Sequence, residues 1–172
     1  MPNPISSAEH RPLNRMARTV GSLDRVPAPL RGWARSKALG RAVRFAGTAG
    51  LEFREMSPAR VVVALANRGK VQNHIGGVHA AAMALLAETA TGFVIGMNLP
   101  DDKLPLIKTM SIDYVRRAQG GLVATAELSA EQIERFFTDP KGEVLVPVEV
   151  KDESGEQPVR CAMTWAWVPK KR

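Results

Sequence analysis

Cysteine is almost absent from this sequence, which has a single one at position 161. One cysteine excludes a disulfide within the chain and a zinc site built from several cysteines. Its scarcity fits a reducing compartment, so we expect a cytoplasmic protein. Tandem repeats and long low-complexity tracts are also absent, which excludes solenoid and fibrous architectures. The 172 residues suit one domain with a sizeable core.

Charge is missing from a long stretch in the middle of the chain. Between Val71 and Pro100 the only Asp, Glu, Lys or Arg is Glu88, although 24% of all residues are charged. The residues from about Val78 to Met97 predict a helix that is apolar nearly all round, as buried helices are. A membrane-spanning helix is the alternative, but the central acid and His79 argue against it.

Glu88 is the first candidate functional residue. A carboxylate on a buried helix is either hydrogen-bonded or has a raised pKa, and such groups cluster at functional sites. The alternative is a structural Glu88 that faces a subunit interface or caps a neighbouring backbone group.

The segment "NHIGGVH" (Asn73–His79) precedes this helix. Its glycines allow a ligand to approach the backbone, and the first N–H groups of a helix favour negative charge. Such an arrangement stabilises the oxyanion of acyl transfer, and Asn73 can orient a carbonyl or a water. His74 and His79 are poorly spaced as metal ligands, and no further His/Cys cluster exists. We therefore expect neither a metal nor a cofactor.

The rest of the chain predicts an α+β fold. Helices are expected over residues 13–24 and Leu30–Phe45, and Ser129 with Gln132 makes a capping box for a further short helix. Strands are expected at Thr48–Met56, Ala59–Asn67, Leu104–Arg117, Leu122–Leu128, Glu143–Lys151 and Pro158–Val168. The later strands lack crossover helices, so the sheet should be largely antiparallel. A long central helix wrapped by a curved antiparallel sheet of about six strands is the hot dog architecture, here with extra N-terminal helices.

Basic charge is concentrated at the N-terminus. Residues 1–47 contain nine Lys or Arg and two acids, a net charge of +7, whereas residues 48–172 contain fifteen of each sign. We therefore expect a basic N-terminal helical extension over 1–47 and a hot dog domain over 48–172. Such a segment is typical of a solvated flank, or of a surface that meets phosphates, anionic lipid or nucleic acid. We expect residues 1–26 to be dispensable for folding.

The stretch "NHIGGVHAAAMALLAETA" resembles the hot dog thioesterases of the phenylacetate-degradation type, whose pattern reads Asn…Gly-x-x-His-Gly-Gly…Asp. It resembles even more closely the DUF4442 group, in which the pattern reads Asn-His…Val-His-Ala-x-Ala…Glu. The segment "SIDYVRRAQGGLVATAEL" is similar to the strand that follows in these families. The resemblance covers roughly Thr48–Val168.

This resemblance implies an acyl-CoA hydrolase, or a hydrolase of a related acyl-carrier thioester. Glu88 stands where the family has its catalytic Asp or Glu, as general base or nucleophile, and Asn73 would orient the thioester carbonyl or the water. The backbone near Gly77, His79 and Ala80 would bind the substrate and form the oxyanion hole.

The resemblance also implies a homodimer or a tetramer. In these families the acid of one chain faces the helix start of the other, so the site lies at the dimer interface. Thr109 or Ser111, on the strand that crosses the helix, could supply a further hydroxyl.

One departure from the family pattern keeps a second function open. The chain has Ala80-Ala81 where the characterised enzymes have Gly-Gly, and each alanine adds a methyl where the thioester approaches. The alternative is therefore a non-catalytic acyl-thioester or lipid-binding protein on the same fold. A nucleic-acid or membrane-surface module driven by residues 1–47 is a further rival. The chain has only nine aromatic residues and no recognised nucleic-acid motif, which argues against nucleic-acid binding. We also expect no stable membrane insertion.

Overall fold

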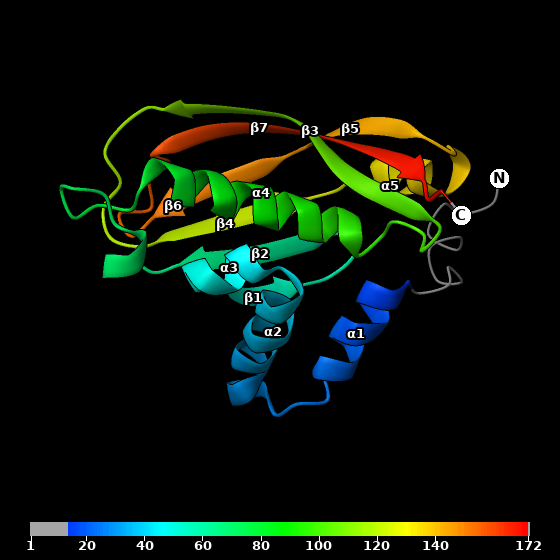
Figure 1. Cartoon of the computed structure of the whole chain (residues 1–172), viewed down its shortest axis with the longest axis horizontal. Helices are drawn as coiled ribbons and strands as arrows, with labels where there is room; N and C mark the ends of the chain where they lie inside the picture. Colours follow the sequence, from blue (N-terminus) through cyan, green and yellow to red (C-terminus); the bar gives the residue numbers. More distant parts are fainter. Residues whose placement is uncertain (1–13, 172) are drawn as a thin grey trace.

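The computed structural model describes residues 14–171, and within them the chain forms five α-helices and seven β-strands (Figure 1). The predicted disorder of Met1–Pro12 lies outside the described residues. The helices are α1 (Arg15–Leu23), α2 (Ala28–Ala42), α3 (Arg44–Ala49), α4 (Ala80–Gly96) and α5 (Ala130–Thr138), with a short 3-10 helix, η1 (Gly69–Val71). The strands are β1 (Glu52–Met56), β2 (Arg60–Leu65), β3 (Lys103–Tyr114), β4 (Leu122–Glu127), β5 (Gly142–Val146), β6 (Val148–Asp152) and β7 (Val159–Pro169).

The strands form an antiparallel surface that curves around α4 (Figure 1). One sheet has the order β1-β2-β4-β6 and the other the order β3-β7-β5. Only Pro147 separates β5 from β6, so a single run of chain passes from one sheet to the other. A long helix held against a curved antiparallel sheet confirms the predicted α+β hot dog fold.

The sequence predicted Glu143–Lys151 as one strand, and the structure divides it at Pro147. Proline has no N–H to donate to a strand ladder, which explains the interruption. Its carbonyl oxygen still accepts a hydrogen bond from the N–H of Glu127 at 3.2 Å. The β5 half therefore pairs with β7, and the β6 half pairs with β4.

The predicted helix Leu30–Phe45 is two helices, α2 and α3. Val43 lies between them with φ −114° and ψ 90°, outside the helical region. Helix α3 includes Thr48, which the sequence placed in a strand, and it ends at Gly50 with a φ of +76°. A glycine adopts this left-handed conformation at little cost, so the chain can turn there into β1.

A bulge in β1 changes which side chains face the core. The sequence predicted that Leu51, Phe53 and Glu55 share one face. The structure buries the first two, but the register against β2 shifts between Phe53 and Glu55. Met56 consequently turns inward, while Glu55 is exposed.

Helix α4 fills the concave side of the sheet. Leu86, Ala90 and Val94 have exposed fractions of 0%. Trp165 of β7 donates from Nε1 to the hydroxyl of Thr91 at 2.9 Å, which ties the helix to the sheet. Among the described residues, no helix has both the length and the apolar character needed to span a membrane.

The N-terminal helices belong to the same core. Nδ2 of Asn14 donates to the carbonyl oxygens of Gly96 and Leu99, both at 2.7 Å, so α1 covers the end of α4. Val20 of α1 and Leu39 of α2 are 1% and 4% exposed, within the hydrophobic cluster that includes α4. The expected boundary between residues 47 and 48 falls inside α3.

Candidate active site

His79 is the N-cap of α4, directly after the glycine-containing turn. Its Nδ1 accepts a hydrogen bond from the N–H of Ala81 at 3.0 Å, and its own N–H donates to the carbonyl oxygen of Val71 at 2.8 Å. Between these two, the N–H of Ala80 has no acceptor within residues 14–171. One free, exposed donor therefore remains at the positive end of the helix dipole.

Asn73 organises the turn that leads into the helix. Its Oδ1 accepts hydrogen bonds from the N–H groups of Ile75 and Gly77, both at 3.1 Å. Gly76, between them, has a φ of +77°. The backbone N–H of Asn73 donates to the carbonyl oxygen of Gly77 at 2.8 Å, whereas its side-chain nitrogen, Nδ2, has no acceptor among residues 14–171 and is free to bind a ligand. The N–H of Gly77 already donates to Oδ1 of Asn73, so this glycine stabilises the turn and has no free N–H for a substrate.

Glu88 lies on α4 and is half-buried. Burial raises the pKa of its carboxyl above the usual glutamate value, and a long hydrogen bond of 3.5 Å from the Thr89 hydroxyl opposes this shift. No cation among the described residues pairs with it. Its neighbours along the same face of the helix, Ala84, Leu85 and Gly92, are apolar and also half-exposed. A carboxylate of this kind is a stronger base than one in water.

Ala80 and Glu88 lie at well-separated positions along α4. Ala80 and Glu88 are eight residues apart on a continuous helix, which corresponds to about 12 Å along its axis. A reacting carbonyl needs both its base and its oxyanion donor at about 3 Å. Within one copy of the chain, the Ala80 N–H and the Glu88 carboxyl therefore start from positions more than two helical turns apart.

Strand β3 runs back along α4 towards the helix start (Figure 1). The hydroxyl of Tyr114 donates to the carbonyl oxygen of Ala80 at 2.9 Å, which fixes the end of the strand at that point. Ser111 pairs with the exposed Ala162 of β7, whereas Met110 and Tyr114 pair with the buried Met163 and Val159. Because side chains alternate along a strand, Thr109 and Ser111 lie on the face of β3 that points away from α4, and the structure does not bring them to Glu88 within one chain. Thr109 and Ser111 are both exposed, and their hydroxyls donate to no side chain within residues 14–171.

An apolar groove of about 350 Å³ opens beside the start of α4. Its floor includes His79, Ala81 and Leu85, and Glu88 follows on the same helical face. The opposite wall comes from α3 and η1 and consists of Phe45, Thr48, Ala49, Lys70, Val71 and Gln72. This wall was not predicted, because the sequence indicates a helix as far as Phe45 and a strand from Thr48, whereas α3 is one helix over Arg44–Ala49.

The residues described, 14–171, contain no group of three or more His, Cys, Asp or Glu that could hold a metal ion. His74 is exposed in the turn, and His79 uses Nδ1 to cap the helix.

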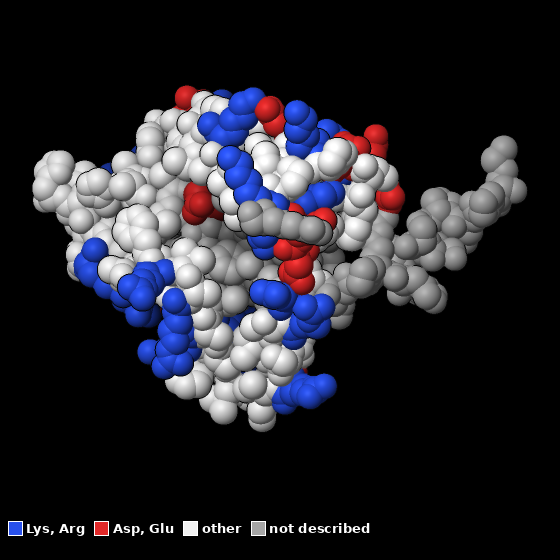
Figure 2. Space-filling model, turned by 45° about the vertical axis from the view of Figure 1, so that its right-hand side comes forward, with Lys and Arg blue, Asp and Glu red and all other residues white. Residues whose placement is uncertain are grey.

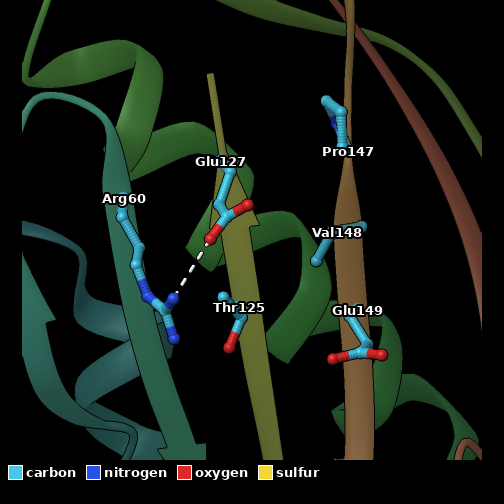
Figure 3. Close-up of a pocket in the computed structure, with 6 residues that line it drawn as sticks. All are labelled: Arg60, Thr125, Glu127, Pro147, Val148 and Glu149. Carbon is cyan, nitrogen blue, oxygen red and sulfur yellow. Dashed lines mark hydrogen bonds and ion pairs between the residues drawn. The ribbon is translucent and has the colours of Figure 1, made fainter. Parts of the chain in front are cut away.

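A second hollow, of about 380 Å³, lies on the face of the sheet that points away from α4 (Figure 3). Arg60 of β2 binds Glu127 of β4 at 3.1 Å there, and Thr125 and Glu149 lie on the same outer face. Glu149 in turn pairs with Lys151 at 2.8 Å. These charges compensate one another across the strands, which stabilises a solvated sheet face. The candidate site residues Thr109, Ser111 and Glu88 do not line this hollow.

The fold and the site geometry define a hot dog protein with a charge-poor central helix that carries one acid. Residues 31–168 match the family described as Domain of unknown function (DUF4442), and the chain belongs to this family. The sequence has no match among curated proteins.

Several solved structures share the fold. PA5026 from Pseudomonas aeruginosa, a protein of unknown function described as a probable thioesterase, has a TM-score of 0.72 at 24% identity over 84% of this chain and 97% of that one. Thioesterase HI1161 from Haemophilus influenzae has a TM-score of 0.63 at 13% identity over 78% of this chain and 90% of that one. A mutant of the Staphylococcus aureus thioesterase SAV0944 has a TM-score of 0.61 at 20% identity over 73% and 99%.

Proposed function

We propose that this protein hydrolyses acyl thioesters at a site shared between two copies of the chain. The observation that carries the proposal is the free N–H of Ala80 at the start of α4, combined with the half-buried carboxyl of Glu88 on the same helix. A backbone donor at a helix N-terminus and a base of raised pKa are the two groups that thioester hydrolysis needs. The thioesterase descriptions of the similar structures support this reaction class.

In the proposed reaction, the carbonyl oxygen of the thioester accepts a hydrogen bond from the Ala80 N–H. Glu88 takes a proton from water while the water oxygen bonds to the carbonyl carbon, and the resulting oxyanion is stabilised by the same N–H and the helix dipole. The C–S bond then breaks, and the proton passes from Glu88 to the leaving thiolate. In the nucleophilic variant, the carboxylate attacks the carbonyl carbon and the C–S bond breaks, so that a mixed anhydride forms and the thiolate leaves. Water then hydrolyses the anhydride, which regenerates the Glu88 carboxylate and releases the acid, and the thiolate takes up the proton set free.

The separation of Ala80 and Glu88 supports a composite site. The backbone positions of Ala80 and Glu88 lie about 12 Å apart along the axis of α4, which favours a second copy of the chain as the source of the other half. Strand β3 has a paired neighbour, β7, on one side only. It also exposes large apolar side chains along its length, namely Leu104 (42%), Leu106 (47%) and Met110 (50%). A long apolar edge strand is suited to pairing with its counterpart in a homodimer.

The remaining candidates take supporting roles in this proposal. The amide of Asn73 orients the thioester carbonyl or the attacking water, since its nitrogen has no acceptor among the described residues. His79 holds the first turn of α4 in place through Ala81, so that only the Ala80 N–H stays available. Thr109 and Ser111 lie on the outer face of β3, so in this proposal neither hydroxyl assists the Glu88 of its own chain. The groove beside Leu85 accepts the apolar part of the substrate.

A second candidate function is non-catalytic binding of an acyl thioester on the same surface. The methyl groups of Ala80 and Ala81 at the helix start favour it, because they crowd the approach of the carbonyl. The same groove would then hold an acyl chain without turnover. Direct measurement of product release separates the two functions.

The test is a hydrolysis screen over acyl chain lengths, with each chain presented both on CoA and on acyl carrier protein. We expect turnover of acyl thioesters on at least one of the two carriers. In Glu88→Gln, this turnover should fall by about 10²- to 10⁴-fold. Binding without thiol release by the wild-type chain would favour the second function. Equal turnover by wild type and Glu88→Gln would remove the glutamate from the mechanism.

A further inference from the structure

The outward face of α2 carries large apolar side chains that no described residue covers. Leu30 is 55% exposed and Trp33 is 65% exposed. At 3.6 residues per turn, Leu30, Trp33, Lys37 and Arg41 fall within an arc of about 80°. We call these four residues the α2 face. The opposite side of the helix faces the core through Leu39, which is 4% exposed.

The α2 face lies in the most basic part of the chain. Residues 25–51 contain six Lys or Arg and no Asp or Glu. Arg35 is buried and pairs with Asp24, whereas Lys37 and Arg41 form no ion pair within residues 14–171. In Figure 2, Lys and Arg side chains are spread over the lower part of the molecule, where the N-terminal helices lie, with little acidic surface between them.

The exposed apolar surface continues into α3. Phe45 follows the α2 face in the chain and is 64% exposed. Phe45 also lines the apolar groove beside α4, together with Leu85. Phe45 therefore belongs both to the exposed apolar surface of this segment and to the wall of the groove.

We propose that the α2 face docks on an anionic phospholipid bilayer. Trp and Leu on one side of a helix, interleaved with Lys and Arg, match the boundary between headgroups and acyl chains, where apolar side chains insert and cations meet phosphate. The helix lies on the membrane plane and does not cross it. Nucleic acid would engage the cations alone and leave Trp33 and Leu30 in water, so it fits this face less well. The docking is independent of the proposed hydrolysis.

The test uses the full chain and vesicles of two compositions, pure phosphatidylcholine and phosphatidylcholine with about a third phosphatidylglycerol, at about 0.15 M salt. We expect co-sedimentation with the anionic vesicles and a blue shift of Trp33 fluorescence, since the other two tryptophans, Trp165 and Trp167, are already buried. No binding to the anionic vesicles, or equal binding to both compositions, would overturn the proposal. Salt-dependent binding of duplex DNA at lower protein concentration than vesicle binding would also overturn it.

Two variants with the same net charge separate the α2 face from overall basicity. Lys37→Glu with Arg41→Glu reverses the charge of the α2 face. Lys141→Glu with Arg160→Glu reverses the charge of two exposed residues elsewhere, one in the loop before β5 and one on β7. We expect the first pair to weaken vesicle binding by at least about tenfold more than the second. Trp33→Ala, at a side chain that contacts solvent, should weaken binding and abolish the blue shift. An equal loss in both charge pairs, or unchanged binding in Trp33→Ala, would contradict a specific docking face.

Discussion

The hydroxyl of Tyr114, the last residue of β3, donates a 2.9 Å hydrogen bond to the carbonyl oxygen of Ala80, the first residue of α4. This bond joins the edge strand to the helix start. It holds the turn that presents the Ala80 N–H, and it fixes the end of β3 at the start of α4. The candidate site thus depends on a contact between segments 34 residues apart in sequence.

Tyr114→Phe removes this bond and little else, because the ring is retained. We expect the free energy of unfolding to fall by about 0.5–1 kcal/mol, as is usual for a partly exposed hydrogen bond. Turnover should fall by up to about tenfold, since the donor at the helix start is held less firmly. Thermal unfolding and kcat report the two effects. An unchanged kcat would mean that Tyr114 does not position the Ala80 N–H.

Glu88→Gln should raise stability most at neutral and alkaline pH. Burial raises the pKa of the folded carboxyl above its unfolded value. The protonated form therefore stabilises the fold at low pH, and this contribution is lost as pH rises through the raised folded pKa. Gln cannot ionise, so the melting temperature of the variant relative to wild type should increase from acidic to neutral pH. A variant that is less stable than wild type at neutral pH would identify Glu88 as a structural residue.

The pH dependence of wild-type turnover should be set by the ionisation of the Glu88 carboxyl. A general base acts as the carboxylate, so kcat/KM should rise with pH through the raised pKa of Glu88, above the usual value for a glutamate.

Asn14→Ala should destabilise the fold. Asn14 is 8% exposed, donates to two carbonyl oxygens at the end of α4 and caps α1 through Ala17. Loss of the cap and of two buried hydrogen bonds should lower the free energy of unfolding by about 2–3 kcal/mol. Ser22→Ala, an exposed hydroxyl on the same helix, is the control and should change it by less than about 0.5 kcal/mol. Deletion of residues 1–26 should consequently lower the melting temperature, contrary to the expectation from the sequence alone.

Gly92→Ala and Gly21→Ala should have opposite effects although both glycines are helical. A Cβ at Gly92 would lie 2.8 Å from the ring of Trp165, so the alanine should cost about 1–3 kcal/mol. A Cβ at Gly21 would meet nothing within 4 Å, and the better helix propensity of alanine should stabilise the protein by about 0.5–1 kcal/mol. Denaturant unfolding of both variants checks this. Equal effects at the two positions would contradict the close packing of α4 on β7.

The sequence predicted the fold well where the pattern was long and uniform. The charge gap around Glu88 predicted a buried helix, and the Ser129 capping box predicted α5, because both signals are local. The sequence missed α3 because its residues are not strongly periodic and no side chain caps its N-terminus. Its position depends on the close approach of Gly47 to the backbone of Gly40. It also missed the break at Pro147, since the valines on both sides continue the alternation of a strand.

The candidate site was only partly visible in the sequence. Asn73, His79 and Glu88 stood out by spacing, but their individual hydrogen bonds did not. Only the structure shows that His79 occupies the Ala81 N–H, so that a single donor, at Ala80, remains. The groove wall at Phe45 and Lys70 comes from segments with no motif, brought to α4 by tertiary packing.

The most direct test of the shared site is complementation between two inactive variants. Ala80→Pro deletes the free N–H at the first position of α4, where proline is well tolerated, and His79 before it already has the extended conformation that precedes proline. Ala80→Gly keeps the N–H and is the control. Glu88→Gln removes the base. When Ala80→Pro and Glu88→Gln chains are unfolded together and refolded, each mixed dimer contains one site with both groups intact. The account predicts that each variant alone is nearly inactive and that the mixture recovers about a quarter of wild-type activity. A mixture no more active than the two variants measured separately would contradict a site built from two chains.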